Sequence, residues 1–294
     1  MTKASVIIGS YNQKNVLNKV LDSFNDQAIP GTDFEVIVAD STSNDGTQEF
    51  LKSYKPKYKF KYIILENKGK AAARNAGVWA ASSDIIIITD SDMVAEKNFV
   101  EAHVNAHKKI GRPACFEGLT YNMSKLTWPI DPMVLSPYIK RDYKNLAKLG
   151  YWFLLTGNLS FPKSIFVTEN GFDEKFTGYG WEDIELGYRF SKKKIPIFYL
   201  KDAINYHYHV VSDDGVIERN VFKGESAKYF LEKHPELKWF LGANPLSILT
   251  YKMIKKNSVI YKLIEKCYSS KINFLNNFGL WFLNEHHYLQ GLID

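Results

Sequence analysis

The sequence predicts an α/β fold in which a mostly parallel sheet is wound with helices. Over the first hundred of its 294 residues, short β-branched runs alternate with amphipathic stretches, a pattern of strands joined by crossover helices. Three of these runs end directly in polar residues. Ligands of such sheets bind at the carboxyl ends of strands, so we expect the functional site there.

The expected strands are Ser5–Ile8, Glu35–Ala39, Tyr62–Leu65 and Ile85–Thr89. A helical apolar face follows Asn12, which we expect to cap that helix. An alanine-rich helix that carries Arg74 is expected after Gly69. We divide the chain into a regular half at 1–110, an aromatic and irregular half at 111–235, and amphipathic helices at 236–294.

The composition is that of a globular protein, with 45% hydrophobic and 24% charged residues. The two cysteines, Cys115 and Cys267, lie outside any C-x-x-C pattern, which excludes a zinc or disulfide framework and favours a reducing cytoplasm. We expect neither a secretory signal nor a membrane span, because no apolar stretch is long enough. The net charge of +6 is spread along the chain without a nucleic-acid-binding motif, so we expect no nucleic acid partner.

Asp90 and Asp92 flank Ser91 directly after the apolar strand IIIIT, where alternate positions can face one ligand. Carboxylate oxygens in this number suit Mg²⁺ or Mn²⁺ held together with a diphosphate. The alternative is an ordinary strand-ending turn, in which Asp and Ser are common.

Glu182 and Asp183 open a helix after a loop rich in glycine and aromatic residues, TGYGW. A carboxylate beside bound substrate can take the proton of an attacking hydroxyl. The alternative is that acids in a first helical turn only complement the helix dipole. His207 and His209 share one face of an extended segment, and one of them is a candidate third metal ligand, although histidines among aromatic residues are often only packed.

Together, the motifs resemble family 2 of the inverting glycosyltransferases over residues 4 to 210. The resemblance rests on four ordered segments, which are SVIIGSYN, EVIVADSTSNDGT, ENKGKAAARNAG and DIIIITDSDM. The later TGNLSF and NGFDEKFTGYGWEDIELGYR are similar to an acceptor-side motif of bacterial chondroitin-type polymerases and galactosyltransferases. The resemblance implies the GT-A fold, a Rossmann-like mixed sheet flanked by helices, here with a helical C-terminal extension.

The resemblance also implies roles for single residues. The nucleotide sugar, by default a UDP-hexose or UDP-N-acetylhexosamine, would contact Ser10, Tyr11, Asn12, Asp40, Asn67, Gly69, Lys70, Arg74, Asp90 and Ser91. Asp92 would bind Mn²⁺ or Mg²⁺ directly, with Asp90 in ribose or water-mediated contact and His209 favoured over His207 as a further metal ligand. The acceptor would contact Gly157, Asn158, Trp181 and Glu182. Asp183 would be the catalytic base of an inverting displacement.

The same resemblance makes 1–110 the nucleotide-sugar-binding half and 111–235 the acceptor-binding half. The sequence departs from the family at Ala39, where a second acid commonly precedes the equivalent of Asp40. No Q-x-x-R-W motif occurs, which argues against a processive, membrane-embedded synthase. We expect a role in surface glycan biosynthesis, with a glycan, a lipid-linked sugar or a protein as acceptor, and the oligomeric state, including a homodimer, stays open.

Two other functions compete with this interpretation. A sugar nucleotidyltransferase should carry a glycine-rich phosphate loop after its first strand, where this chain has SYNQKN. An inactive sugar-nucleotide or glycan-binding module would not need Asp92 and Asp183.

The C-terminal segment 244–283 mixes lysines with bulky apolar residues. This mixture is typical of helices that lie in a membrane interface, so we expect peripheral contact with the inner membrane face. The alternative is that these helices pack on the core or on a second subunit.

Overall fold

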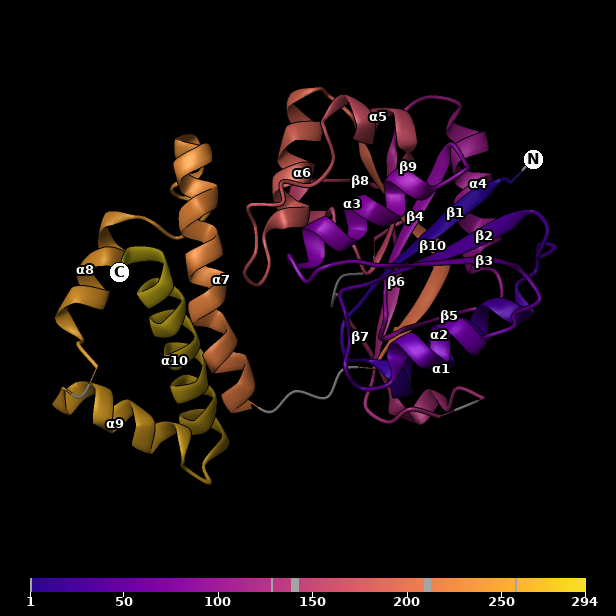
Figure 1. Ribbon diagram of the computed structural model, residues 1–294. Coiled ribbons are helices and arrows are strands. Elements are labelled where there is room, and N and C mark those ends of the chain that lie inside the picture. Colours follow the sequence, from indigo (N-terminus) through magenta and orange to yellow (C-terminus); the bar gives the residue numbers. More distant parts are fainter. Residues whose placement is uncertain (1, 128, 139–142, 209–212, 257) are drawn as a thin grey trace. The chain divides into compact units, whose positions relative to one another are not determined.

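The computed structural model describes residues 2–127, 129–138, 143–208, 213–256 and 258–294. The chain divides into two compact units, and each is described by itself (Figure 1). The first unit contains Met1–Lys175 and Glu182–Val210 and holds the sheet. The second contains Phe176–Trp181 and Val211–Asp294 and is built from helices.

The sheet of the first unit is mixed, with the strand order β3-β2-β1-β4-β9-β6-β10-β5. Its parallel part is formed by β1 (Ala4–Ser10), β2 (Phe34–Asp40), β3 (Lys59–Ile64) and β4 (Ile85–Asp90). The remaining strands are β5 (Met93–Ala95), β6 (Cys115–Met123), β7 (Leu135–Pro137), β8 (Lys148–Leu149), β9 (Asn158–Pro162) and β10 (Ile197–His207). β9 runs antiparallel to both β4 and β6, and β10 runs parallel to β6. The expected mixed sheet is therefore confirmed.

Helices cover both faces of this sheet. They are α1 (Lys14–Ser23), α2 (Thr47–Ser53), α3 (Lys70–Ala80), α4 (Phe99–Ile110), α5 (Lys163–Thr168) and α6 (Glu182–Lys192), and the 3₁₀ turns are η1 (Phe24–Asp26), η2 (Pro132–Val134) and η3 (Tyr151–Phe153). Val6 and Ile8 of β1 pack in one core with Leu17 of α1, whereas Ile7 packs in another with Val78 of α3. Because successive strand residues point to opposite faces, β1 is buried on both sides.

The loop after β1 corrects one expectation. Gln13, rather than Asn12, occupies the N-cap position of α1, and no side chain caps that end. Asn12 instead adopts a left-handed φ of 52°, and its Oδ1 accepts the N–H of Asn44 at 2.9 Å. Its own N–H donates to Ser43 Oγ at 2.8 Å. Asn12 therefore ties the loop after β1 to the loop after β2.

The second unit is built from α7 (Asp213–Lys233), η4 (Pro235–Leu237), α8 (Pro245–Met253), α9 (Val259–Tyr268) and α10 (Asn273–Ile293). It starts at residue 211, whereas the sequence placed the start of the helical extension at 236. The reason is that α7 packs along α10, where Gly224 and Gly291 bring the two backbones into close contact. Among the described helices, none is long and apolar enough to cross a membrane.

Candidate active site

Three neighbouring strands deliver polar side chains to one edge of the sheet. Ser10 and Asp40 are register partners at the carboxyl ends of β1 and β2, and Gly9 is paired with Asp90 at the end of β4. Parallel strands end on the same side, so these residues lie together as the sequence predicted.

Ser10 and Asp40 differ in how their polar atoms are used. The Asp40 carboxylate is fully buried and accepts the N–H of Ser43 at 2.9 Å and its hydroxyl at 2.6 Å. Ser10 Oγ is buried without a hydrogen-bond partner among the described residues. Buried polar atoms normally have partners, which makes this hydroxyl a candidate ligand contact. Tyr11, which follows it, is half exposed.

The turn that leads into α3 carries three more of the predicted donor contacts. Asn67 Oδ1 accepts the N–H of Gly69 at 3.2 Å, and Gly69 has a φ of 92° that a side chain would strain. Lys70 is the first residue of α3. A lysine at the start of a helix is suited to phosphate groups, which helix N-termini attract.

Arg74 of α3 connects the strand-end carboxylates to α6. Its buried guanidinium donates from Nη1 to Glu182 Oε1 at 2.6 Å and from Nη2 to Asp90 Oδ1 at 2.8 Å. Burial opposes the charge of Arg74, but the two carboxylates outweigh it and raise the pKa of Arg74 above its ordinary range. Both Nη atoms of Arg74 thus donate to protein carboxylates. Arg74 is therefore better placed to position Asp90 and Glu182 than to contact the diphosphate.

This bridge also holds Glu182 in place. The residue is 5% exposed and its Oε1 accepts the hydrogen bond from Arg74, while its contact with an acceptor stays a prediction. Asp183 is the neighbouring residue, and its Oδ1 accepts the N–H of Ile184 at 2.8 Å. Burial, with a further contribution from the negative charge of Glu182, raises the pKa of Asp183 to about 7, while Arg74 opposes the shift. A carboxylate that titrates near neutral pH can act as a general base.

Glu117 is a further acid of this region that the sequence did not single out. It lies on β6, is buried, and accepts the N–H of Leu155 through Oε2 at 3.2 Å. Burial raises its pKa well above the usual range, and the charge of Asp183 acts in the same direction. A single acid in the otherwise apolar run ACFEGL was the signal available in the sequence.

Asp92 and His207 are the described residues best placed to hold a metal ion. Asp92 Oδ2 lies 3.6 Å from His207 Nε2, and β10 pairs His207 with Met93. His207 Nδ1 lies 3.3 Å from Asn122 Oδ1. A carboxylate and an imidazole together suit Mn²⁺, for which a diphosphate would supply the remaining oxygens. Within the described residues no group of three or more His, Cys, Asp or Glu side chains converges on one point, and His209 lies outside them.

Asn158 makes its side-chain hydrogen bonds within the sheet. Its side chain is fully buried, and its amide donates to the carbonyls of Leu119 at 3.3 Å and Ala203 at 3.0 Å. Its Oδ1 lies 3.0 Å from His103 Nε2. The amide therefore has a structural role, because it satisfies backbone groups of β6 and β10, and the acceptor contact of Asn158 stays a prediction.

Gly157 lies next to the carboxyl end of β4. Its carbonyl accepts Asn205 Nδ2 at 2.7 Å and Thr89 Oγ1 at 3.0 Å, next to the carboxyl end of β4. A Cβ at this position would lie 2.6 Å from the side chain of Met93. Residue 157 is thus held close to the Asp90–Asp92 turn.

Trp181 belongs to the second unit, where its loop packs on α7. The indole N–H donates to the carbonyl of Lys223 at 3.0 Å, and the ammonium of Lys223 lies 5.3 Å from the ring centroid. Arg219 lies over Tyr179 in the same way, at 5.6 Å. Trp181 has a φ of 75°, which is rare for a bulky residue and is a form of strain found near functional sites.

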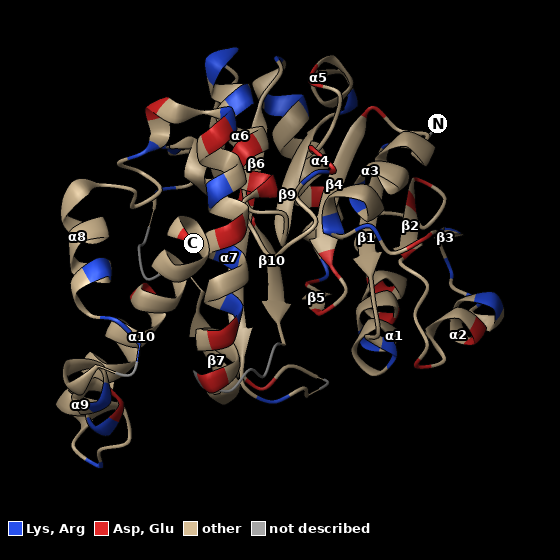
Figure 2. Ribbon diagram, turned by 60° about the vertical axis from the view of Figure 1, so that its left-hand side comes forward, with Lys and Arg blue, Asp and Glu red and all other residues tan. Residues whose placement is uncertain are grey.

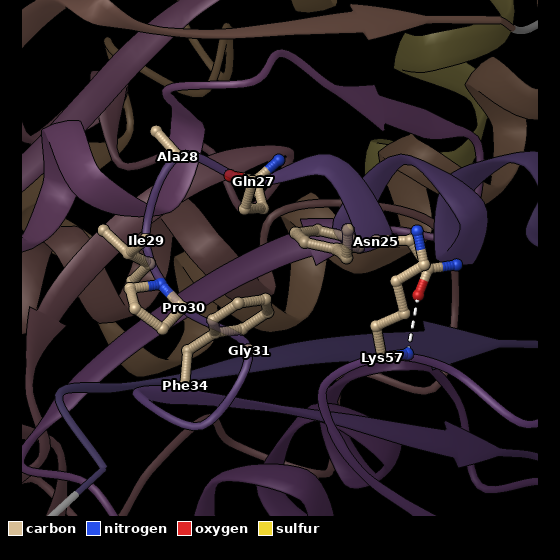
Figure 3. Close-up of a pocket in the computed structure, with 9 residues that line it drawn as sticks. Asn25, Gln27, Ala28, Ile29, Pro30, Gly31, Phe34 and Lys57 are labelled. Carbon is tan, nitrogen blue, oxygen red and sulfur yellow. Dashed lines mark hydrogen bonds between the residues drawn. The ribbon is translucent and has the colours of Figure 1, made fainter.

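A cavity of 360 Å³ lies at the opposite end of the sheet (Figure 3). It is lined by the loop after η1, by Phe34 at the amino end of β2, and by Lys57, whose N–H donates to Asn25 Oδ1 at 2.8 Å. None of the predicted site residues lines it. It is therefore separate from the strand ends that carry the carboxylates.

The Arg74 bridge gives a stability prediction. We expect Arg74→Met to lower the free energy of unfolding by about 3–5 kcal/mol, because it leaves Glu182 buried without its partner. Adding Glu182→Gln should restore part of the loss. Urea unfolding at pH 7 measures both, with Lys3→Met as the control, since the exposed Lys3–Asp33 pair should contribute less than about 1 kcal/mol. Equal losses for Arg74→Met and Lys3→Met would contradict the bridge.

The family model for glycosyl transferase family 2 matches residues 5–167, more than half of the chain. The chain belongs to this family. A second model, the N-terminal domain of galactosyltransferase, matches residues 139–213 of this glycosyltransferase. The two matches cover the donor-side and acceptor-side motifs in turn, which confirms the resemblance found in the sequence.

A curated relative of known name is similar to this family member over two thirds of its length. Validoxylamine A glucosyltransferase of Streptomyces hygroscopicus subsp. limoneus is 30% identical over 224 residues, which is 66% of this chain and 49% of that protein. The chain thus spans about half the length of curated relatives that it matches.

Two solved structures share the fold of this glycosyltransferase. The mannosyltransferase PcManGT of Pyrobaculum calidifontis, in complex with GDP-Man and Mn²⁺, has a TM-score of 0.63 and 17% identity over 99% of this chain and 87% of that one. S. aureus TarS in complex with UDP-GlcNAc has a TM-score of 0.60 and 14% identity over 99% and 90%. These likenesses confirm the GT-A fold.

Proposed function

We propose that this glycosyltransferase moves a sugar from a UDP-sugar to an acceptor hydroxyl with inversion at the anomeric carbon. The observation that carries the proposal is the Arg74 bridge, which joins the strand-end carboxylate Asp90 to the start of the helix that bears Asp183. Donor-side acids and a carboxyl that titrates near neutral pH are thereby held at one edge of one sheet.

In the proposed reaction Asp183 accepts the proton of the acceptor hydroxyl. The oxygen of that hydroxyl forms a bond to the anomeric carbon as the bond from this carbon to the diphosphate oxygen breaks. The attack comes from the side opposite the leaving group, so the configuration inverts. Arg74 and Glu182 act as positioning residues, because Arg74 contacts both Glu182 and Asp90.

The donor would lie across the ends of β1, β2 and β4. Ser10, Tyr11 and Asp40 would contact the nucleoside, and Asn67, Gly69 and Lys70 the diphosphate. Support comes from the buried hydroxyl of Ser10, which lacks a partner among the described residues. The bound UDP-GlcNAc of TarS supports a nucleotide sugar as ligand of this fold, and UDP is our choice of nucleotide.

We propose that Asp92 and His207 hold a divalent metal ion, Mn²⁺ or Mg²⁺, with Asp90 and His209 as further candidates. When bound, the ion would neutralise charge that develops on the departing diphosphate. The separation of 3.6 Å between the Asp92 and His207 side chains supports the pair, as does the Mn²⁺ bound in PcManGT.

The acceptor would bind beside Asp183 in the first unit, with Gly157 as a contact. Trp181 belongs to the second unit, and its contact with the acceptor stays a prediction. In this proposal 1–110 remains the donor half and 111–235 the acceptor half. The role in surface glycan biosynthesis and the cytoplasmic placement stay predictions. The acceptor class, whether glycan, lipid-linked sugar or protein, and the oligomeric state stay open.

An assay of sugar-nucleotide hydrolysis tests the proposed function. The chain is incubated with Mn²⁺ and a panel of UDP-, GDP- and dTDP-sugars, and the released nucleoside diphosphate is identified. We expect UDP from at least one UDP-sugar. Release of pyrophosphate from UTP and a sugar phosphate would instead indicate a nucleotidyltransferase, and tight binding without any turnover would indicate an inactive binding module.

The raised pKa of Asp183 predicts how the rate depends on pH. Asp183 accepts a proton only when it is ionised, so kcat should rise about tenfold per pH unit below a pKa of about 7 and level off above it. Glu182→Gln removes a negative charge that raises the pKa of Asp183. The inflection in the rate profile of this variant should therefore lie at lower pH than in the wild-type protein. Initial rates at saturating donor and metal between pH 5 and 9 measure both curves, and a flat wild-type profile would contradict the assignment.

A further inference from the structure

The segment 244–283 exposes an apolar face on each of its three helices. These faces consist of Leu246, Leu249 and Met253 on α8, Val259, Ile260 and Leu263 on α9, and Phe274, Phe278 and Trp281 on α10. The spacings of i, i+3 and i+7 on α8 and i, i+4 and i+7 on α10 each define one side of a helix. Exposure reaches 78% at Phe274 and 76% at Val259. We call these nine residues the docking face.

On α9 and α10 the docking face is a second apolar side, in addition to the one that packs inside the unit. Tyr261 and Ile264 of α9 and Leu283 of α10 are buried together with Ile217 of α7. An ordinary surface helix needs only one such side. α8 and α9 both pack against α10. Exposed apolar patches of this kind mark sites of interaction.

Within the segment 244–283 the charged side chains are almost all positive. Between residues 244 and 283 the chain has six lysines and a single acid, Glu265. Basic residues mark α8 and α9 in Figure 2. At 3.6 residues per turn, Lys262 and Lys266 lie beside Val259 on α9, whereas Glu265 lies farther round the helix. Lysine stems can lie along apolar surface while their ammonium groups reach outward.

We propose that α8, α9 and α10 bind the surface of an anionic phospholipid bilayer through the docking face. Charge decides between a bilayer and a second copy of the chain. A symmetric dimer would bring the same lysines of two copies toward one another, which is unfavourable, whereas anionic headgroups attract them. Phe274, Phe278 and Trp281 are aromatic residues suited to the boundary between headgroups and acyl chains.

Co-sedimentation with lipid vesicles tests this proposal. At low salt we expect the chain to bind vesicles of phosphatidylcholine with phosphatidylglycerol, to release from them at high salt, and to leave pure phosphatidylcholine vesicles unbound. Failure to bind the anionic vesicles at low salt would overturn the proposal. No donor sugar is present, so this failure would leave the proposed transfer reaction untouched.

Two sets of variants locate the contact. Replacing Phe274, Phe278 and Trp281 by Ser should abolish binding, whereas Met133→Ser, at a 90% exposed position of the first unit, should not. The lysine set Lys255→Gln, Lys256→Gln and Lys262→Gln should weaken binding about 100-fold. Its charge-matched control is Lys108→Gln, Lys109→Gln and Lys193→Gln. Equal weakening by the control set would overturn the assignment to this face.

Sedimentation equilibrium tests whether a second copy of the chain covers the docking face instead of a bilayer. Circular dichroism verifies that each variant is folded. A monomer without vesicles is the expected result. A dimer that the Phe274, Phe278 and Trp281 variant dissociates would assign the docking face to a second copy and overturn the proposal. Because the lysine variants change only exposed side chains, they keep the test decisive if the aromatic variant fails to fold.

Discussion

Asp183→Asn should lower kcat by about 10²–10⁴, the range that general base catalysis contributes. The amide keeps the size of the side chain but cannot take the acceptor proton. Binding of UDP should change little, because in the proposed mechanism Asp183 acts on the acceptor. Steady-state rates give kcat, and titration calorimetry gives the dissociation constant of UDP.

Asp84→Asn is the matched control for this variant. Asp84 is an exposed acid directly before β4, at the end of the strand opposite Asp90, so its amide variant should keep the wild-type rate. If Asp183→Asn also turned over at the wild-type rate, Asp183 would have no part in the reaction. The buried Glu117 would then be the next acid to replace.

Asp92→Ala should abolish transfer, and removal of divalent ions with EDTA should do the same to the wild-type protein. The proposed ion connects the protein to the diphosphate, so both changes should also weaken UDP binding. Calorimetry with and without Mn²⁺ provides a readout that does not depend on activity. In Asp92→Ala the affinity for UDP should no longer respond to Mn²⁺. Full activity in EDTA would exclude the metal.

Variants of the two histidines separate their roles. His207 Nε2 lies 3.6 Å from Asp92 Oδ2, so His207→Ala should reduce the effect of Mn²⁺ on UDP binding. His209, which the family resemblance favours, would show the larger loss if it is the ligand.

The central strands were predictable because their burial leaves a strong signal. β1, β2 and β4 are almost completely buried, and each expected run lies inside the observed strand. The third strand was predicted at Tyr62–Leu65, whereas β3 spans Lys59–Ile64. This strand is largely exposed at the edge of the sheet, so its hydrophobic pattern is weak. Edge strands bury less apolar surface, so sequence patterns define their ends poorly.

The partners of the site residues were less predictable than their positions. The motifs placed Asp90, Asp92 and Asp183 at the ends of elements, as the structure does. The pairing of Arg74 with Glu182 joins residues 108 positions apart, and no local pattern reports such a contact. The hydrogen bonds of Asn158 were unpredictable for the same reason, because its amide donates to carbonyls of two strands that are distant in sequence.

The compact helical unit begins earlier than the predicted helical extension for a related reason. The lysine-rich composition changes near Pro235, but the preceding helix α7 already packs on α10. Contacts between helices that are distant in sequence decide where a compact unit begins, and composition does not reveal them.

A crystal structure of the chain with UDP and Mn²⁺, with anomalous scattering used to locate the metal, tests the account most directly. The account predicts the nucleoside against Ser10 and Asp40, the diphosphate near Lys70, and the manganese peak in contact with Asp92. UDP bound in the cavity beside Phe34, or a manganese peak remote from Asp92, would contradict it.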